Sequence, residues 1–597
     1  MFRKITFRLP WICNFILLFN LSTGQIKAQE NPFGSTKGKQ YSIEERDSLF
    51  LRALTVLPEN RIPVQYRDVL PEPSAVGCAT MILGEVLENF DMFSFEQKRV
   101  LNTLLQRPEL PLNMISLSGR FKIHYTETGL DAVPSDDLDN NGIPDFVEEV
   151  AQAFENSHQV EVDELGYQEP PDDAGVAGPE YDVYIQNLGS NWYGFTQPES
   201  DPPETPQNDR RSYVVMDNDF TQHFTPGVPA AKVTAAHEYY HAIQFGYRNF
   251  SLVNDERYYY ELCSVWMEDV IYDEVNDYYQ YLRAFFQRTD IPFNMFDAFG
   301  HYLGEALWNH FLVKKYNDFN VIRRTWEIME DDVPVLEAMD QSLKEKGSSF
   351  VDEYSEFAIW NYFTGSRADP AGHYDESTEY PEISLNGEFE ILSDTTVVDS
   401  SSSLTHKYYK FTTLISEEYS ISGFVEEPSN WMFSAITATP GAAPRFYIFH
   451  PLRGQNFGFL PGSSEIVVMP VNLKILENVK QTLSNSEFLS FNFSIKLRQL
   501  EIPVTKGIAD FFPNPFVVNQ HVEISFIFFG LENENIDVRI FSSDGRVIKS
   551  DNLSNNSKIY SWNGKDDDGE LVSSGIYLFQ LKQRGFTDVK KFAVIRE

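Results

Sequence analysis

The spacing of apolar and polar residues changes along the chain, from helical repeats in its first part to short strand-like runs later. Residues 41–57 and 95–105 carry apolar side chains at helical spacing and predict two helices near the N-terminus. Strand-like apolar runs, which predict a small sheet, follow at residues 121–125, 181–185 and 212–216. The stretch 190–211 is rich in Pro, Asn, Asp and Gly, and is expected to be a loop.

The pattern becomes all-β towards the C-terminus. After about residue 374 the helical spacing stops, and turn residues separate many short apolar runs. Residues 376–502 therefore predict a β-sandwich, and residues 503–597, where Asp-Gly turns join apolar runs, predict a small Ig-like sandwich. The expected fold class is multidomain α+β, with two all-β sandwich domains at the end.

The most specific stretch is HEYYH at residues 237–241, because a helix would place its two histidines on one face. Thr234 is the expected N-cap and Gly246 the expected stop of a helix of about three turns. Imidazoles at this spacing suit Zn²⁺, and Glu238 is placed to act as general base on a zinc-activated water. The alternative is a helix with two incidental histidines.

A catalytic zinc site needs a third protein ligand. A third histidine six residues after the second would serve, but that position is Tyr247. The other common arrangement uses a glutamate on a second helix, and Glu261 follows His241 with 19 residues between them. That distance allows a short loop and a returning helix, so we expect His237, His241 and Glu261 to bind zinc.

This layout resembles the gluzincin metallopeptidases, in which HExxH is followed at about this distance by a glutamate, small residues and a second acidic residue. Ser264 and Glu268 match the later positions, and either Glu268 or Asp269 is expected to orient a histidine, unless both are simply solvated. Tyr260 departs from the asparagine that many of these enzymes carry. The chain has no Gly-x-Met-Glu-Asn motif for a substrate amine, so an endopeptidase is favoured over an aminopeptidase.

The resemblance also implies a tyrosine or histidine from a later helix that stabilises the oxyanion. Tyr302, shortly before Gly304, is the first candidate and His301 is the second. For either residue the alternative is an ordinary structural role.

A calcium loop is expected at residues 137–148, which read DLDNNGIPDFVE and match the spacing of an EF-hand loop. The expected Ca²⁺ ligands are Asp137, Asp139, Asn141, the carbonyl of Ile143, Asp145 and Glu148. Gly142 stands where such a loop turns sharply. The alternative is an acidic turn before a helix. In a secreted enzyme, calcium at this loop would stabilise the fold.

Composition and the N-terminus indicate export. Basic residues precede an apolar run that is too short to span a bilayer, so residues 1–28 are expected to be a signal peptide cleaved after Ala28. No other apolar stretch is long enough, and no transmembrane segment is expected in the mature chain. The net charge of −40, from 88 acidic and 48 basic residues, would repel nucleic acid.

Residues 29–118 form an N-terminal helical segment ahead of the domain expected at 119–375. One hypothesis makes this segment an inhibitory propeptide, in which Cys78, next to Gly77, occupies the open zinc position as a thiolate. The alternatives are a buried free cysteine or a Cys78–Cys263 disulfide.

Two wider resemblances follow from these motifs. Residues 121–308 resemble a group of secreted bacterial metallopeptidases that share an IHY strand, an NGIPD calcium loop, a YDVY strand and an HEYxH helix. The last segment, with its FPNPF, SSDGRVI and SGIYLF runs, resembles the type-A C-terminal sorting domain of the type IX (Por) secretion system. That resemblance implies interaction with the type IX secretion machinery, followed by secretion or attachment at the cell surface. The alternative is a plain Ig-like accessory domain.

Together these expectations describe a secreted zinc-dependent metalloendopeptidase acting on protein or peptide substrates, with a zincin-like catalytic domain ahead of the two sandwiches. The alternative function is a surface adhesin or carbohydrate-binding protein whose zincin domain is inactive. The intact Glu238 favours the enzyme, because binding alone needs no general base.

Overall fold

The computed structural model describes most of the chain beyond residue 40. The described residues are 41–58, 61–71, 77–171, 175, 178–199, 208–250, 255–297, 300–391, 395–413, 419–425, 430–438, 443–449, 456–460, 464–475, 490–499, 506–512, 514–518, 523–529, 531, 535–554 and 559–596. The expected signal peptide, residues 1–28, lies outside these ranges. Within them, no helix has both the length and the apolar character needed to cross a membrane.

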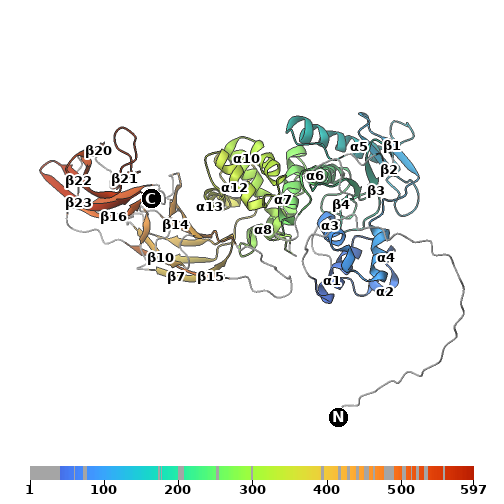
Figure 1. The fold of residues 1–597 in the computed structure, drawn as a ribbon, viewed down its shortest axis with the longest axis horizontal. Coiled ribbons are helices and arrows are strands. Elements are labelled where there is room, and N and C mark those ends of the chain that lie inside the picture. The colour runs from blue at the N-terminus through green and yellow to red at the C-terminus, as the bar shows by residue number, and fades with distance from the viewer. Residues whose placement is uncertain are drawn as a thin grey trace, which may run out of the picture.

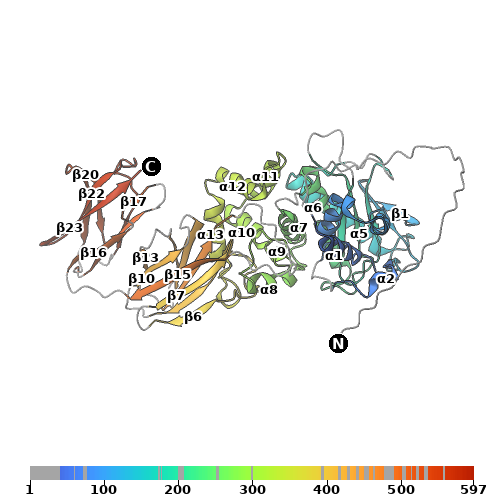
Figure 2. The ribbon, with the colours of Figure 1, turned by 60° about the horizontal axis from the view of Figure 1, so that its bottom comes forward.

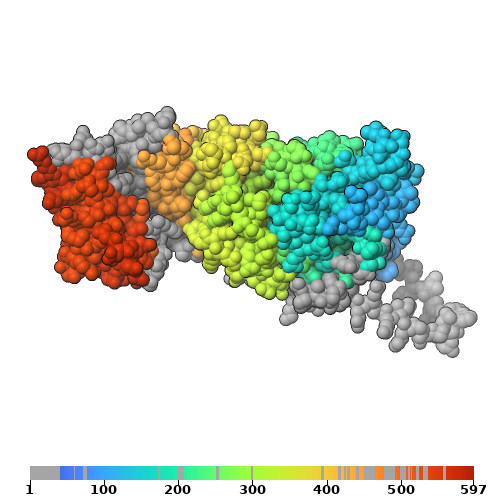
Figure 3. Space-filling view, turned by 90° about the horizontal axis from the view of Figure 1, so that it is seen from above, coloured from blue at the N-terminus to red at the C-terminus, as the bar shows by residue number. Residues whose placement is uncertain are grey.

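The molecule is elongated, with the N-terminal helices at one end and the last β-domain at the other (Figure 1). A turned view shows the N-terminal helices and the small sheet together at one end, followed by further helices and then the β-domains (Figure 2). The space-filling view shows these parts as successive bands of colour along the long axis (Figure 3). Helices and several β-sheets in separate parts of one chain confirm the multidomain α+β class.

The N-terminal segment folds into short helices. Two of them start at serine N-caps, since Ser42 accepts from the backbone N–H of Glu45 and Ser94 from that of Gln97, each in a reciprocal capping box. The elements are α1 (Ile43–Leu54), α2 (Val64–Arg67), α3 (Thr80–Glu88), the 3-10 turn η2 (Phe90–Met92) and α4 (Phe95–Leu104). The predicted helices at 41–57 and 95–105 are confirmed as α1 and α4.

Five strands form a mixed sheet in the order β1-β2-β3-β5-β4. They are β1 (Leu112–Ile115), β2 (Phe121–Tyr125), β3 (Tyr181–Ile185), β4 (Gly194–Pro198) and β5 (Ser212–Met216). Strands β2, β3 and β5 are parallel, and β1 and β4 are antiparallel to their neighbours. The three strands predicted from apolar runs are confirmed at the same residues.

Strand β4 shows that the expectation of a loop across 190–211 is wrong at residues 194–198. Its sequence, Gly-Phe-Thr-Gln-Pro, has no alternation of apolar and polar residues. The tendency to form a strand depends strongly on the neighbours against which it packs. Here β5 pairs with one edge of β4, and residues just before α3 pair with the other. Tertiary pairing therefore produces this strand.

Both faces of the sheet are covered, so alternate residues of its strands enter two different cores. Val214 and Met216 of β5 face the core that they share with α5 (Asp145–His158) and α6 (Val228–Tyr247). Tyr213 and Val215 face the core formed with α1, α3 and α4. The N-terminal helices are therefore packed on the sheet.

Helix α6 carries the HEYYH motif and, at 20 residues, is longer than predicted. It starts after Gly227, whose φ is +68°, with Pro229 in the first turn, so Thr234 lies inside the helix and is not its N-cap. Gly246 also lies inside the helix, where a Cβ would come within 3.1 Å of Pro171. Helix α7 (Arg257–Ile271) packs beside α6.

Further helices connect this region to the β-domains. They are the π-helical turn η3 (Gln159–Glu164), α8 (Tyr279–Gln287), α9 (His301–Gly304), α10 (Leu307–Tyr316), α11 (Asn320–Met329), α12 (Val335–Glu345), α13 (Phe350–Trp360) and the 3-10 turn η4 (Gly365–Arg367). Successive side chains of strand β11, in the first β-domain, enter two different cores. Met432 lies in the core of the helical part, and Phe433 lies in the core of the β-domain. The helical part and the first β-domain thus share an apolar interface.

Each β-domain consists of two sheets. The first has strand orders β13-β10-β15-β7 and β12-β11-β14-β9-β6, with β8 beside β14, and the second has β16-β18-β21 and β17-β23-β22-β19-β20. The strands are β6 (Gly387–Glu390), β7 (Thr395–Ser402), β8 (Thr405–His406), β9 (Tyr409–Thr412), β10 (Tyr419–Val425), β11 (Trp431–Ala438), β12 (Arg445–Phe449), β13 (Asn456–Leu460), β14 (Glu465–Asn472), β15 (Ser490–Gln499), β16 (Gly507–Phe512), β17 (Phe516–Val517), β18 (Ile524–Phe529), β19 (Ile536–Ser542), β20 (Val547–Leu553), β21 (Ile559–Trp562), β22 (Gly575–Gln583) and β23 (Phe586–Ile595).

Candidate metal centre

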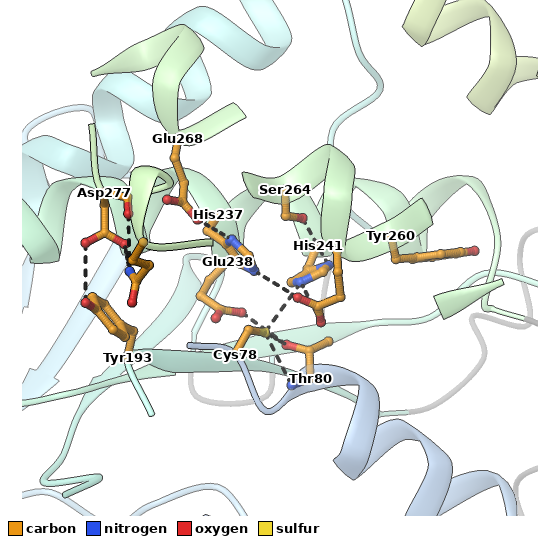
Figure 4. A network of polar contacts seen from close by, with 12 residues as sticks. Cys78, Thr80, Tyr193, His237, Glu238, His241, Tyr260, Ser264, Glu268 and Asp277 are labelled. Carbon is orange, nitrogen blue, oxygen red and sulfur yellow. Dashed lines mark hydrogen bonds and ion pairs between the residues drawn. The ribbon is translucent and has the colours of Figure 1, made fainter. Parts of the chain in front are cut away.

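Four buried side chains meet between the edge of the sheet and helices α6 and α7. They are Cys78, His237, His241 and Glu261, and their donor atoms all lie within 4.8 Å of one another. Figure 4 shows the two histidines on one face of α6, with Cys78 approaching from the side of α3. The carboxylate of Glu261, on α7, lies 3.5 Å from His237 Nε2 and 3.6 Å from His241 Nε2.

The donors in this cluster fit a metal ion. The His237 Nε2 atom and both carboxylate oxygens of Glu261 are buried and have no hydrogen-bond partner. Burying a carboxylate in this way costs free energy unless it is paired or coordinates a metal. Two imidazoles, a carboxylate and a thiol form a donor set that suits Zn²⁺.

Both imidazoles are held through the ring nitrogen that does not face the cluster. His237 Nδ1 lies 2.7 Å from Glu268 Oε1. His241 Nδ1 lies 2.7 Å from Gln244 Oε1 and 3.2 Å from Ser264 Oγ. Such contacts fix the orientation and tautomer of the ring and leave Nε2 for a metal.

The sequence indicated some of these partners and missed others. Of the two acidic residues expected to orient a histidine, Glu268 makes the contact, whereas Asp269 lies 3.8 Å from His310. Gln244 was not predicted. A glutamine one turn after the second histidine, between the apolar residues Ile243 and Phe245, is the signal that would have found it.

Glu238 is hydrogen-bonded towards the edge of the sheet. Its Oε2 atom accepts from Thr196 of β4 at 2.8 Å and from Thr80 at the start of α3 at 3.1 Å, and neither threonine was predicted. Burial raises the pKa of the Glu238 carboxyl to about 7. Gly194 permits the close approach of β4, because a Cβ there would lie 3.1 Å from Glu238 Cγ and 3.0 Å from the Val215 carbonyl oxygen.

Cys78 comes from the N-terminal segment. Its Sγ atom lies 3.5 Å from His241 Nε2 and 3.0 Å from Thr80 Oγ1. Cys78 and Cys263 are both free and buried, so the alternative of a disulfide between them is wrong. Cys263 instead lies 3.2 Å from the side-chain nitrogen of Asn309.

The two oxyanion candidates lie in different surroundings. Burial raises the pKa of Tyr302 well above its usual value, and the charge of Glu261 adds to the shift, so this hydroxyl is within electrostatic reach of the cluster. His301 Nδ1 lies 3.1 Å from Glu305 Oε1. The His301 side chain lines a small cavity together with His406 of the first β-domain. The groups that shift the pKa of Tyr302 include Glu261 and Cys78 of the cluster, whereas His301 lines the cavity beside the first β-domain.

Tyr281 of α8 is a further buried tyrosine near the cluster. Burial raises its pKa well above the usual value, and nearby acidic groups, Glu261 among them, add to the shift. A Cβ on Gly77 would lie 2.7 Å from the Tyr281 hydroxyl oxygen, so the two residues approach closely. With 30 tyrosines in the chain, nothing in the sequence distinguishes this one.

The loop before α5 gathers acidic side chains, as expected for a calcium loop. Three carboxylates offer oxygens within 4.8 Å of one another: Asp137, Asp139 and Asp145. Gly142 has a φ of +87°, a conformation that favours glycine at this turn. The side chain of Asn141 donates to Glu148 Oε1 at 2.7 Å. The loop thus brings together five of the six predicted ligand residues through their side chains.

The end of the chain matches a known family. Residues 510–595 match the model of a secretion system C-terminal sorting domain. This match supports the predicted type IX sorting domain and its interaction with the type IX secretion machinery. It indicates that the protein is exported and is either secreted or held at the cell surface. No curated protein matches the chain.

Solved structures resemble parts of the chain only weakly. They include PorZ, described as an essential bacterial surface component of the type-IX secretion system of Porphyromonas gingivalis, at 16% identity and a TM-score of 0.14, over 27% of this chain and 22% of that one. A mutant PliG lysozyme inhibitor from Escherichia coli aligns at 8% identity and a TM-score of 0.13, over 19% of this chain and 98% of that one. The Epf adhesin domain of Streptococcus pyogenes aligns at 10% identity and a TM-score of 0.13, over 34% of this chain and 77% of that one. TM-scores this low carry no information about function.

Proposed function

We propose that this exported protein is a zinc metalloendopeptidase whose zincin-like domain consists of the five-stranded sheet and helices α6 and α7. The observation that carries the proposal is the buried cluster of His237, His241 and Glu261, whose donor atoms include three without hydrogen-bond partners. Glu238 lies on the same helix, at the edge of the sheet.

Each side chain has a role in peptide hydrolysis. Zinc held by the two histidines and Glu261 would supply Lewis acidity that polarises the scissile carbonyl. Glu238 takes the proton from the attacking water and passes it to the leaving amine. Glu268 and Gln244 keep the imidazoles oriented. The Tyr302 hydroxyl is the candidate for stabilising the oxyanion.

The edge of the sheet gives the substrate a place to bind. Strand β4 is the last strand of the sheet and lies beside Glu238. An extended peptide recognises such an edge through backbone hydrogen bonds. We therefore place the scissile peptide along β4.

We further propose that the loop at residues 137–148 binds Ca²⁺. Its oxygens include those of Asp137, Asp139 and Asp145, and carboxylates are the ligands that Ca²⁺ prefers. Calcium would tie the start of α5 to the loop and stabilise the domain.

One observation favours a second candidate, a surface-binding protein with a structural zinc ion. A structural zinc site has four protein ligands and no open position, and Cys78 lies with the three other donors. Glu238 distinguishes the two candidates, because a structural site needs no general base.

The test compares the wild-type protein with Glu238→Gln, measuring zinc content and the hydrolysis of casein or a peptide library. We expect the variant to keep its zinc and to lose hydrolysis by about 10²–10⁴-fold, the usual contribution of a general base. Both proteins are also tested with Cys78→Ser, which would open the fourth position. Bound zinc without any cleavage, even after this substitution, would favour the binding protein.

A further inference from the structure

The segment that precedes α3 lies along the edge of β4 that faces away from β5. The backbone N–H of Tyr193 donates to the carbonyl of Gly77 at 2.7 Å, and that of Ala79 donates to the carbonyl of Gly194 at 3.1 Å. Cys78 and Gly194 form a parallel β-bridge. These hydrogen bonds use the backbone groups of the sheet edge that an extended peptide would need.

Two side chains of the same segment reach the metal cluster and the general base. Cys78 Sγ stands with the donor atoms of His237, His241 and Glu261 (Figure 4). Thr80 donates to Glu238, and its hydroxyl accepts from a backbone N–H of β4 at 2.8 Å. All of these side chains are buried; Cys78 is 4% exposed. The metal cluster and the general base are therefore buried while the segment is in place.

From this geometry, and on the basis of the proposed function, we infer that residues 77–80 form an intramolecular plug. In this plug Cys78 is the fourth zinc ligand, and the backbone of the segment occupies the edge of β4 where a substrate would bind. The plugged protein is latent. Hydrolysis requires displacement of the thiolate from the metal and of the segment from β4.

The plug is held by the packing of the N-terminal helices. Helix α3 starts at Thr80, the last residue of the plug, and its residues Ile82 and Leu83 lie in the core beneath the sheet. Glu85 of α3 forms a buried ion pair with Arg257 of α7. Removing all of these helices would expose the apolar sheet face that they cover, which costs free energy in proportion to the area exposed. Opening by a local movement of residues 77–80 avoids that cost.

The inference is tested first by a measurement that does not depend on activity. The full chain is loaded with Co²⁺ in place of zinc, because a thiolate ligand produces a strong near-ultraviolet charge-transfer band that nitrogen and oxygen ligands do not. We expect the wild-type protein to show this band. Cys78→Ser should lose it while still binding Co²⁺, and Cys263→Ser should keep it. Cys263 is a matched control, because it is also a buried free thiol but is not in the cluster.

Different results would overturn the proposed function and the plug. If the protein binds no Co²⁺ or Zn²⁺, the proposed function fails and the inference fails with it. If it binds Co²⁺ but the wild type lacks the thiolate band, the inference is wrong and the proposed function stands. The wild-type spectrum decides this point even if Cys78→Ser folds poorly.

Latency is tested by peptide hydrolysis with the zinc-loaded proteins. We expect Cys78→Ser to be more active than the wild type by about tenfold or more, because the open state no longer competes with the plug. Cys263→Ser should match the wild type. A thiolate band in the wild type together with equal activity in wild type and Cys78→Ser would overturn the plug and leave Cys78 as a structural ligand.

Discussion

Glu261 and Glu161 are both buried glutamates whose carboxylate oxygens have no hydrogen-bond partner. Their surroundings differ, because Glu261 lies with two histidines and a cysteine, whereas Glu161, in the turn η3, belongs to none of the donor clusters among the described residues. This difference is what we expect if Glu261 is a ligand of the proposed zinc ion and Glu161 is not. Burial raises the pKa of Glu161 well above its usual value.

This pair provides a prediction with a matched control. Glu261→Gln should lower zinc affinity by about 100-fold or more, beyond the 10–100-fold that loss of an outer partner costs. Glu161→Gln should leave the zinc content unchanged, because it removes a buried carboxyl outside the cluster. Zinc content is measured after dialysis against buffers of fixed free zinc. Equal zinc affinity in the Glu261→Gln variant and the wild type would show that Glu261 is not the third ligand.

At the scale of elements, the loop at residues 137–148 runs into the first turn of α5. Calcium that binds only the folded loop stabilises the domain by RT ln(1 + [L]/Kd), about 2.7 kcal/mol at 100 times Kd. We expect added Ca²⁺ to raise the melting temperature of the wild type. Asp137→Asn should remove this rise, since it replaces one of the clustered carboxylates.

Asp136→Asn is the control for the calcium loop, because this exposed neighbour lies outside the ligand spacing. The three proteins are compared by calorimetry across a Ca²⁺ titration. A rise that persists in Asp137→Asn, or one that disappears equally in Asp136→Asn, would contradict the proposed calcium loop.

The elements also show how far pattern alone can predict structure. The apolar runs of β2, β3 and β5 and the helical spacing of apolar residues in α1 and α4 are local features, and each was predicted. Strand β4 was not, because it is formed by pairing with β5 and with the residues before α3. The early start of α6 was also missed, since Gly227 and Pro229 begin the helix without a side-chain cap.

At the scale of the whole molecule, a buried polar cluster joins the helical part to the first β-domain. His406 of β8 and His301 of α9 line one small cavity with Glu305. Burial lowers the pKa of both histidines to about 3 from an ordinary value of 6.5, and raises that of Glu305 well above 4.5. Both histidines are therefore neutral in the folded protein near pH 6.

This cluster predicts a pH dependence of stability. As pH falls below 6.5, the unfolded chain binds protons at His301 and His406 while the folded protein does not, so the two histidines lower stability down to about pH 3. His406→Gln should reduce this loss of stability with falling pH by up to about 1.4 kcal/mol per pH unit. Glu305→Gln should make the loss steeper. The raised pKa of the Glu305 carboxyl stabilises the folded protein at low pH, and this contribution is lost as pH rises above 4.5. Urea unfolding followed by tryptophan fluorescence measures the slopes, and equal slopes in all three proteins would contradict these pKa shifts.

The C-terminal domain gives a prediction about the location of the protein. Residues 510–595 match the secretion sorting domain, and residues of this domain form a core of their own. Deleting them should leave the remaining domains folded but stop export, so that the protein accumulates within the cell envelope. Cell fractionation with antibody detection measures this. Surface exposure or secretion of the truncated chain at wild-type levels would show that the domain is dispensable for export.

The sequence by itself determined the features that depend on local spacing. The two histidines four residues apart share a helix face because of helical periodicity, and the acidic loop converges because its glycine turns the backbone. Only the tertiary structure decided which distant residues join them. Cys78 reaches His241 across 163 positions of the chain, through a strand pairing that no local pattern encodes, since such contacts depend on how the N-terminal helices pack on the sheet.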